Sequence, residues 1–306
     1  MYGIHNEQNG NITVSSGTVE AGQYSIYNDS INTINITGGT IRINYCYNSK
    51  TSWYGIYNNV SANINITGGK IVSSISGGNY EYYYGIYNKE NGNIVLSEID
   101  GIYVNTSSGY SYGIYNNGEG KVTLENGKIE AKGEYLSYGI RNVANGEIEV
   151  KKGDIKAISS NGYAYGIENG SLGKLKISGG NIAAETTKGA SYGIRNISIS
   201  MLNITGGNIT AKGTQSYGIY NNTSDLTIGV NDETISNDVP VITSDNIGIF
   251  VYEVSSRFNF YDGKIIAKET TLSEANIPSG YRLLKYYDES TQKEIAILSE
   301  PDNYVL

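Results

Sequence analysis

Three charged residues recur at a fixed spacing in the middle of this sequence. Arg141, Glu168 and Arg195 are separated by 27 and 27 residues. If 27 residues make one structural repeat, the three side chains are neighbours. A glutamate between two arginines favours a surface ion ladder, which contributes less than about 1 kcal/mol per pair and requires no ligand. Contact with an anionic sugar is the alternative.

Four tyrosines form a second candidate site, because each occupies the same position of a repeated pentapeptide. Exposed aromatic rings beside a flat row of glycines could bind a glycan or a protein partner. Stacked tyrosines also stabilise neighbouring strands without any ligand, so both interpretations stay open. The candidate ligand-binding residues are therefore Tyr27, Tyr57, Tyr87, Tyr115, Arg141, Glu168 and Arg195.

Other patterns argue against catalysis and metal binding. His5 is the only histidine and Cys46 the only cysteine. This argues against a Ser-His-Asp triad within this fragment and excludes metal sites built from several histidines or cysteines. The Gly-Gly-x-Gly-x-Asp pattern of calcium-binding solenoids is absent, and a pair of glycosidase carboxylates is not evident. We expect no catalytic residues, no metal and no cofactor.

These residues belong to a repeat that runs through almost the whole chain. The motif Tyr-Gly-Ile-x-Asn and its variants occur in ten copies that are 22 to 30 residues apart. Each copy is followed by a short apolar segment, a glycine turn and a further apolar segment, as in Leu124-Glu-Asn-Gly-Lys-Ile-Glu-Ala131. Apolar residues alternate with period two, which indicates strands and no helix.

Strands this short cannot form a stable sheet alone, but equivalent strands of successive repeats can pair in parallel and enclose a common core. We therefore predict an all-β fold, a three-sided parallel β-helix of about ten coils. If the motif Ile points inward, strict alternation places Tyr and Asn inward too, and Gly and the variable residue outward. The asparagines, from Asn6 to Asn221, should then form a hydrogen-bonded ladder.

The C-terminal region departs from the repeat. Ile277-Pro-Ser-Gly-Tyr281 indicates a turn, and Tyr281 to Tyr287 with Glu294 to Leu298 could form a hairpin that caps the open end. We expect a parallel β-helix over residues 1–272 and a cap or linker over 273–306. Since the repeat begins at residue 2, we expect the chain to be a fragment with its targeting signals elsewhere.

Composition limits the partners. The net charge is −8 and the pI about 4.9, without a basic cluster, which argues against nucleic acid. No apolar stretch reaches the roughly 20 residues that cross a bilayer, so we expect no membrane insertion within this fragment. The lone cysteine, Cys46, is interpreted as a turn residue and not as a nucleophile.

The Tyr-Gly-Ile-Tyr-Asn and Ile-Thr-Gly-Gly-x-Ile units resemble the right-handed parallel β-helix repeat proteins on the surfaces of gut Firmicutes. The resemblance implies right-handed coils, secretion and surface display, and no particular reaction. We expect a non-enzymatic extracellular or cell-surface scaffold or adhesin-like display module, with a glycan or a host or cell-surface protein as its partner. The alternatives are a carbohydrate-binding or carbohydrate-degrading β-helix, and a phage or appendage component.

Overall fold

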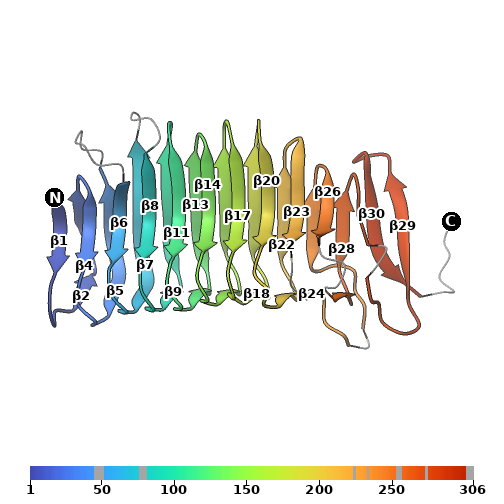
Figure 1. Cartoon of the computed structure of the whole chain (residues 1–306), viewed down its shortest axis with the longest axis horizontal. Coiled ribbons are helices and arrows are strands. Elements are labelled where there is room, and N and C mark those ends of the chain that lie inside the picture. Colours follow the sequence, from blue (N-terminus) through green and yellow to red (C-terminus); the bar gives the residue numbers. More distant parts are fainter. Residues whose placement is uncertain are drawn as a thin grey trace.

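The computed structural model describes residues 1–44, 52–75, 81–222, 225–232, 234–252, 257–272 and 275–300, with the side chains of 74 and 75 excepted. Within these ranges the chain consists of strands and turns, without helix. Figure 1 shows the strands stacked side by side along one long axis, with the N-terminus at one end and an antiparallel hairpin at the other. The all-β parallel solenoid is confirmed. Cys46 lies outside the described residues.

The first face of the solenoid is a parallel sheet in which the repeated pentapeptides lie side by side. Its order follows the chain, and the equivalent Ile and Asn residues of successive coils pair in register, for example Ile114 with Ile140. The sheet contains β1 (Tyr2–Asn6), β4 (Tyr24–Asn28), β6 (Ser52–Asn58), β8 (Tyr82–Asn88), β11 (Tyr110–Asn116), β14 (Leu136–Asn142), β17 (Tyr163–Asn169), β20 (Ala190–Asn196), β23 (Gln215–Asn221) and β26 (Ile247–Val251).

Eight of these ten described strands have a neighbour of the same sheet on both edges, whereas β1 and β26 are its ends. The regular part of the solenoid therefore has about eight turns, slightly fewer than the ten coils expected from the motif count. The difference arises because the terminal copies of the motif form the edges of the stack.

The second face is built from three-residue strands of the form apolar-x-apolar. Their outer two residues point inward, as the burial of Val122 and Leu124 shows. The strands are β2 (Ile12–Val14), β9 (Ile94–Leu96), β12 (Val122–Leu124), β15 (Ile148–Val150), β18 (Leu175–Ile177), β21 (Leu202–Ile204), β24 (Leu226–Ile228) and β27 (Phe258–Phe260).

The third face follows the glycine turn. In two coils the chain continues through this turn as one strand, so that β5 (Ile34–Ile43) and β7 (Ile64–Ile75) belong to both the second and the third faces. The remaining strands of the third face are β3 (Thr18–Ala21), β10 (Ile99–Thr106), β13 (Gly127–Gly133), β16 (Asp154–Ser159), β19 (Asn181–Thr186), β22 (Asn208–Lys212), β25 (Val241–Ser244) and β28 (Lys264–Ala267).

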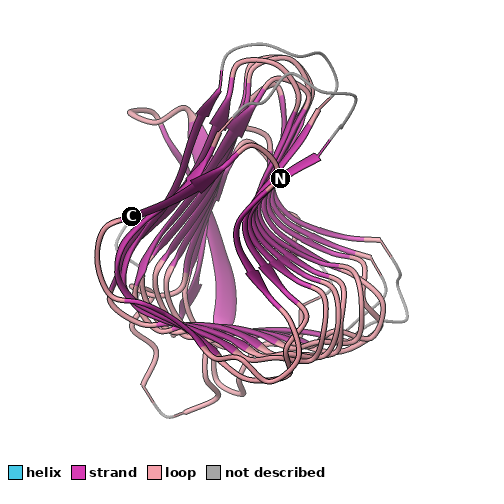
Figure 2. Ribbon diagram, turned by 90° about the vertical axis from the view of Figure 1, so that its left-hand side faces the viewer, coloured by secondary structure: helices cyan, strands magenta, loops and turns pink. Residues whose placement is uncertain are grey.

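Viewed end-on, the three faces enclose a continuous interior (Figure 2). One apolar cluster runs from Ile12 to Leu298 and contains the inward isoleucines, leucines and valines of all three faces. Burial of a side chain such as Ile140, which is 0% exposed, contributes about 1.5–3 kcal/mol. Because each coil buries its apolar residues only against its neighbours, stability depends on the stack as a whole.

The C-terminal end is closed by the hairpin of β29 (Arg282–Asp288) and β30 (Lys293–Ser299), which confirms the predicted hairpin. Strand β30 pairs antiparallel with β28 and buries Ala296 and Leu298 against the core. The other two faces also receive a partner, because Glu269 pairs with Ile247 and Asn276 with Asn259. The hairpin thereby covers the edge that β28 would otherwise leave open. The domain boundary at residue 273 stays a prediction.

Candidate functional site

The inward direction of the motif Ile and Asn is confirmed, but the direction predicted for Tyr and Gly is wrong. Ile140 and Asn142 are fully buried. A Cβ added to Gly139 would lie 2.3 Å from Ile155 Cγ2, a core atom of the third face, so the glycine also faces inward. The motif tyrosines instead lie on the outer side, where their rings contact the variable residues.

Two successive inward residues, Gly and Ile, break the alternation of each first strand. Strict alternation failed here because the strand departs from the regular pleat between Gly and Ile, and Figure 2 shows that the sheet that begins beside the N-terminus is curved. The reason lies in the opposite wall. An apolar residue near the start of the third-face strand of the same coil fills the space over the glycine, as Ile129 of β13 does over Gly113. Sequence variation could not reveal this, because the tyrosine is as constant outside as the isoleucine is inside.

This departure from the pleat brings two outward columns together. The motif tyrosines stack along the axis with ring centroids 4.6 to 5.2 Å apart, as in the pairs Tyr84–Tyr112 and Tyr2–Tyr24. The fourth motif residues are here called the variable column, and its rings from Tyr27 to Tyr115 stack in the same way. The two columns meet edge to face, with 4.9 Å between the rings of Tyr54 and Tyr57. Central motif tyrosines are almost completely covered by these contacts.

The candidate binding tyrosines therefore form one packed column. The rings of Tyr27, Tyr57, Tyr87 and Tyr115 are 5.0 to 5.2 Å apart, with interplanar angles of 4° to 5°. Their faces cover one another, so mainly ring edges are directed to solvent, and the adjacent glycines point inward. This geometry favours the packing interpretation. A role in binding glycans or proteins stays a prediction.

Burial also changes the acidity of the outward tyrosines. It raises the pKa of Tyr54 to about 12, and it raises the pKa of Tyr84, Tyr112, Tyr138 and Tyr165 as well. The main cause is desolvation, which disfavours the phenolate. Neighbouring phenols and Glu168 add to the effect, whereas Arg141 and Arg195 oppose it. At neutral pH the columns are uncharged except where the variable column contains ionised residues.

The predicted ion ladder is confirmed, although its carboxylate is not at the surface. Arg141 Nε lies 2.9 Å from Glu168 Oε1, and Arg195 Nη1 lies 2.5 Å from Glu168 Oε2. The Glu168 side chain is only 4% exposed, against 29% and 31% for the arginines. Arg141 covers the ring of Tyr138, with 4.9 Å to its centroid, and Arg195 lies 5.8 Å from that of Tyr165. The triad thus continues the aromatic column in charged form.

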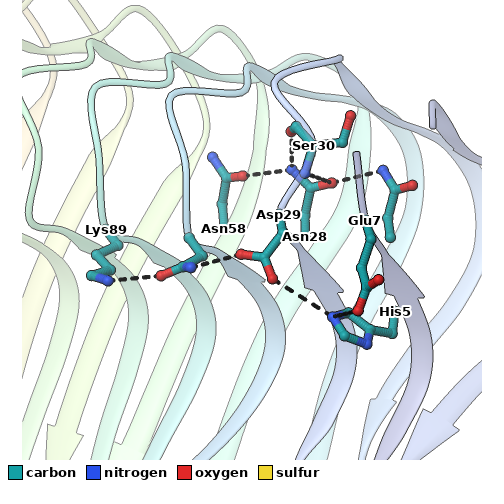
Figure 3. A network of polar contacts seen from close by, with 9 residues as sticks. His5, Glu7, Asn28, Asp29, Ser30, Asn58 and Lys89 are labelled. Carbon is teal, nitrogen blue, oxygen red and sulfur yellow. Dashed lines mark hydrogen bonds and ion pairs between the residues drawn. The ribbon is translucent and has the colours of Figure 1, made fainter. Parts of the chain in front are cut away.

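The asparagine ladder is the most regular polar feature of the molecule. Each Asn Nδ2 donates to the Oδ1 of the next coil at 2.8 to 3.0 Å, as Asn142 does to Asn169. Most of these asparagines also donate to the carbonyl four residues on, as Asn142 does to Gly146, whereas Asn28 donates to the carbonyl of Ser30. The ladder thus joins the coils to one another and fixes each corner. Figure 3 shows Asn28 and Asn58 within it.

Beside the ladder, the first four coils carry a polar network (Figure 3). His5 occupies the variable column next to Tyr27, as expected. Its Nε2 lies 3.4 Å from Glu7 Oε1 and 3.6 Å from Asp29 Oδ2. The network continues through Asn59, which donates to Asp29, to Lys89. Within the ranges that the structure describes, no group of three or more His, Cys, Asp and Glu side chains could hold a metal ion.

A groove that the sequence did not reveal runs along the corner between the second and third faces. Its volume is about 580 Å³. Glycines form its floor, and the polar residues that line it come from several coils. The sequence features that contribute to this groove are the glycine turns and the one extra residue between Leu96 and Ile102. Neither feature indicates a groove unless the stacking register is known. The lining residues include Asp100, Tyr103, Lys128, Lys152, Asp154, Asn181 and Asn208.

Known proteins add no further assignment. No family model, curated protein or solved structure matches this chain. In the part of the chain that the structure describes, no helix has the length and apolar character needed to cross a membrane.

Proposed function

We propose that this chain is a non-enzymatic, extracellular or cell-surface scaffold that displays its faces along a rigid β-solenoid. The observation that carries the proposal is the continuity of the columns. The asparagine ladder connects Asn6 to Asn221 through every intervening coil. A column of hydrogen bonds and a shared apolar core resist bending, because a bend would have to open contacts between coils.

The outward columns fit the same role. They are stacked against themselves, so they stiffen the face while they cover the core. The repeat resembles that of proteins located on the surfaces of gut bacteria, and this resemblance supports extracellular display. Packed outer columns and a net charge of −8 suit a protein that stays apart from polyanions and from other copies.

Rigidity can be tested by distance measurements on the whole chain. Asn9 and Ile199 occupy equivalent corner positions seven coils apart. Spin labels at Asn9→Cys and Ile199→Cys, with Cys46→Ser, should give one narrow distance distribution near 34 Å, since a coil rises by about 4.8 Å. A broad distribution would contradict a rigid scaffold.

Display and lack of catalysis need separate tests. Antibodies against the chain should label intact cells that produce it, and protease added to those cells should remove the signal. Labelling that appears only after lysis would refute surface display. Incubation with plant and host polysaccharides should release no reducing ends. Release that is lost together with a single carboxylate would establish the carbohydrate-degrading alternative instead.

A further inference from the structure

The groove at the corner between the second and third faces has a bare floor. Gly127, Gly153, Gly180 and Gly207 occupy the same place in four successive coils, and all have positive φ, between 85° and 124°. Side chains rarely adopt this conformation. An added Cβ would also meet the preceding coil, since the one on Gly180 would lie 2.6 Å from the Gly153 carbonyl oxygen. These four positions of the corner therefore remain free of side chains.

One end of the groove is closed by an irregular coil. Between Leu96 and Ile102 the chain has one residue more than between Leu124 and Ile129, and the pairing of β10 with β13 shifts between Ile99 and Ile102. This bulge places Ile99, Asp100 and Tyr103 at the end of the groove. The step explains why the hollow begins at this coil.

A row of polar side chains follows one rim. Lys128, Asp154, Asn181 and Asn208 are paired in register, so one group is presented per coil, at intervals of about 4.8 Å. Asn181 Nδ2 donates to Asp154 Oδ1 at 2.7 Å, and Asn208 Nδ2 donates to Asn181 Oδ1 at 2.9 Å. Each of these bonds uses one N–H or one lone pair, so further donors and acceptors of the same groups remain available.

The charges of the groove are mixed. The lining contains two cations, Lys128 and Lys152, and two anions, Asp100 and Asp154. Lys128 is already paired with Glu130, with 3.2 Å between the charged atoms. A polyanion or a polycation would meet like charges in such a site. An uncharged ligand whose groups both donate and accept hydrogen bonds can bond to the amides, the carboxylates and the ammonium groups of this lining.

A peptide strand fits this site less well. The carbonyl oxygens of Gly153, Gly180 and Gly207 already accept from the backbone N–H groups of Asn181, Asn208 and Val241 at 2.8 to 2.9 Å. The floor therefore offers no carbonyl row for strand addition. Hydroxyl groups can instead bond to the side chains of the rim.

We propose that this groove binds an uncharged oligosaccharide, extended along the solenoid axis with about one sugar residue per coil. The ligand is held through its hydroxyls by Asp154, Asn181 and Asn208, and its terminal residue lies against the wall at Asp100 and Tyr103. The inference concerns a site away from the tyrosine columns and does not depend on the scaffold role.

The test is titration of the full chain, followed by NMR or calorimetry, with cellotetraose and chitotetraose as neutral probes and tetragalacturonate as the charged one. We expect saturable binding of at least one neutral probe and weaker binding of the charged one. Asn181→Ala should weaken binding about tenfold, which corresponds to about 1.4 kcal/mol. Thr40→Ala, at the equivalent position two coils before the groove begins, should leave binding unchanged.

Both substitutions are at outward positions, and equal melting temperatures will show that both variants fold. The proposal is overturned if no neutral probe binds at millimolar concentration, or if Asn181→Ala and Thr40→Ala weaken binding equally. Preference for tetragalacturonate, or binding of an extended peptide such as a polyserine control with no neutral sugar bound, would also overturn it.

Discussion

The asparagine column and the variable column are formed by adjacent residues of each repeat, but the two positions are constrained very differently. Asn142 bonds to its own corner and to the next coil, and it is fully buried. Its neighbour Arg141 contacts only outward side chains, and this position contains His, Tyr, Arg, Glu or Phe in other coils. A position is thus fixed where one side chain must satisfy two partners at once. It varies where any group that complements the adjacent coil is sufficient.

High pH should weaken the outward columns more than any single substitution. The folded pKa of Tyr54 is about 12, against about 10 in the unfolded chain. The stability that depends on its protonated state is present below pH 10 and is lost as the pH rises toward 12, at up to about 1.4 kcal/mol per pH unit for each such tyrosine. Denaturant unfolding at about pH 8 and pH 11 measures this loss.

The same titration can measure the contribution of a single tyrosine. Tyr54→Phe removes one ionisable group but retains the ring, so it should reduce the slope of stability against pH without lowering stability at neutral pH by much. Unfolding free energies that stay equal from about pH 8 to pH 11 would show that the tyrosines are not desolvated as described.

The next largest effect is expected at the inward glycine. Gly139→Ala places a methyl group 2.3 Å from Ile155 Cγ2 and 2.6 Å from the Gly166 carbonyl oxygen. Overpacking of this kind costs about 3 kcal/mol, because the backbone of the next coil cannot move away alone. Gly170→Ala is the control, since its nearest atom is 3.2 Å away. Similar melting temperatures for both variants would mean that the glycine does not face the core.

Asn142→Leu tests the ladder. It leaves Asn116, Asn169 and the Gly146 carbonyl with one hydrogen bond fewer each. Unsatisfied buried groups make this cost about 1–3 kcal/mol. Asn145→Leu, three residues later, removes hydrogen bonds to Glu119, Ser171 and Leu172. It should cost less, because these groups lie on the exposed corner and can bond to water instead. An unchanged thermal melt of Asn142→Leu would refute the ladder.

Periodicity predicted the solenoid, the asparagine ladder and the adjacency of Arg141, Glu168 and Arg195, because all of these depend only on equivalent residues being one coil apart. It failed where neighbouring faces interact. The inward Gly139 depends on Ile155 of the opposite wall, and the burial of Glu168 depends on the arginines and rings around it. The groove requires both the bulge at Ile99 and the stacking register, neither of which a motif count contains.

The smallest effect is expected for Glu168→Gln, which tests whether the variable column is permissive even at its most buried position. The amide keeps the shape but loses the attraction to Arg141 and Arg195. Breaking a fully buried ion pair costs about 3–5 kcal/mol, but these arginines are about 30% exposed, so a loss of about 1 kcal/mol is expected.

Glu185→Gln is the control. The Glu185 carboxylate lies 3.5 Å from Lys156 Nζ at the surface, so this substitution should cost less. High salt should abolish the smaller effect and preserve the larger, because a buried carboxylate is poorly screened. If both variants lost the same stability and high salt abolished both losses, the ion pairs of Glu168 would be ordinary surface pairs.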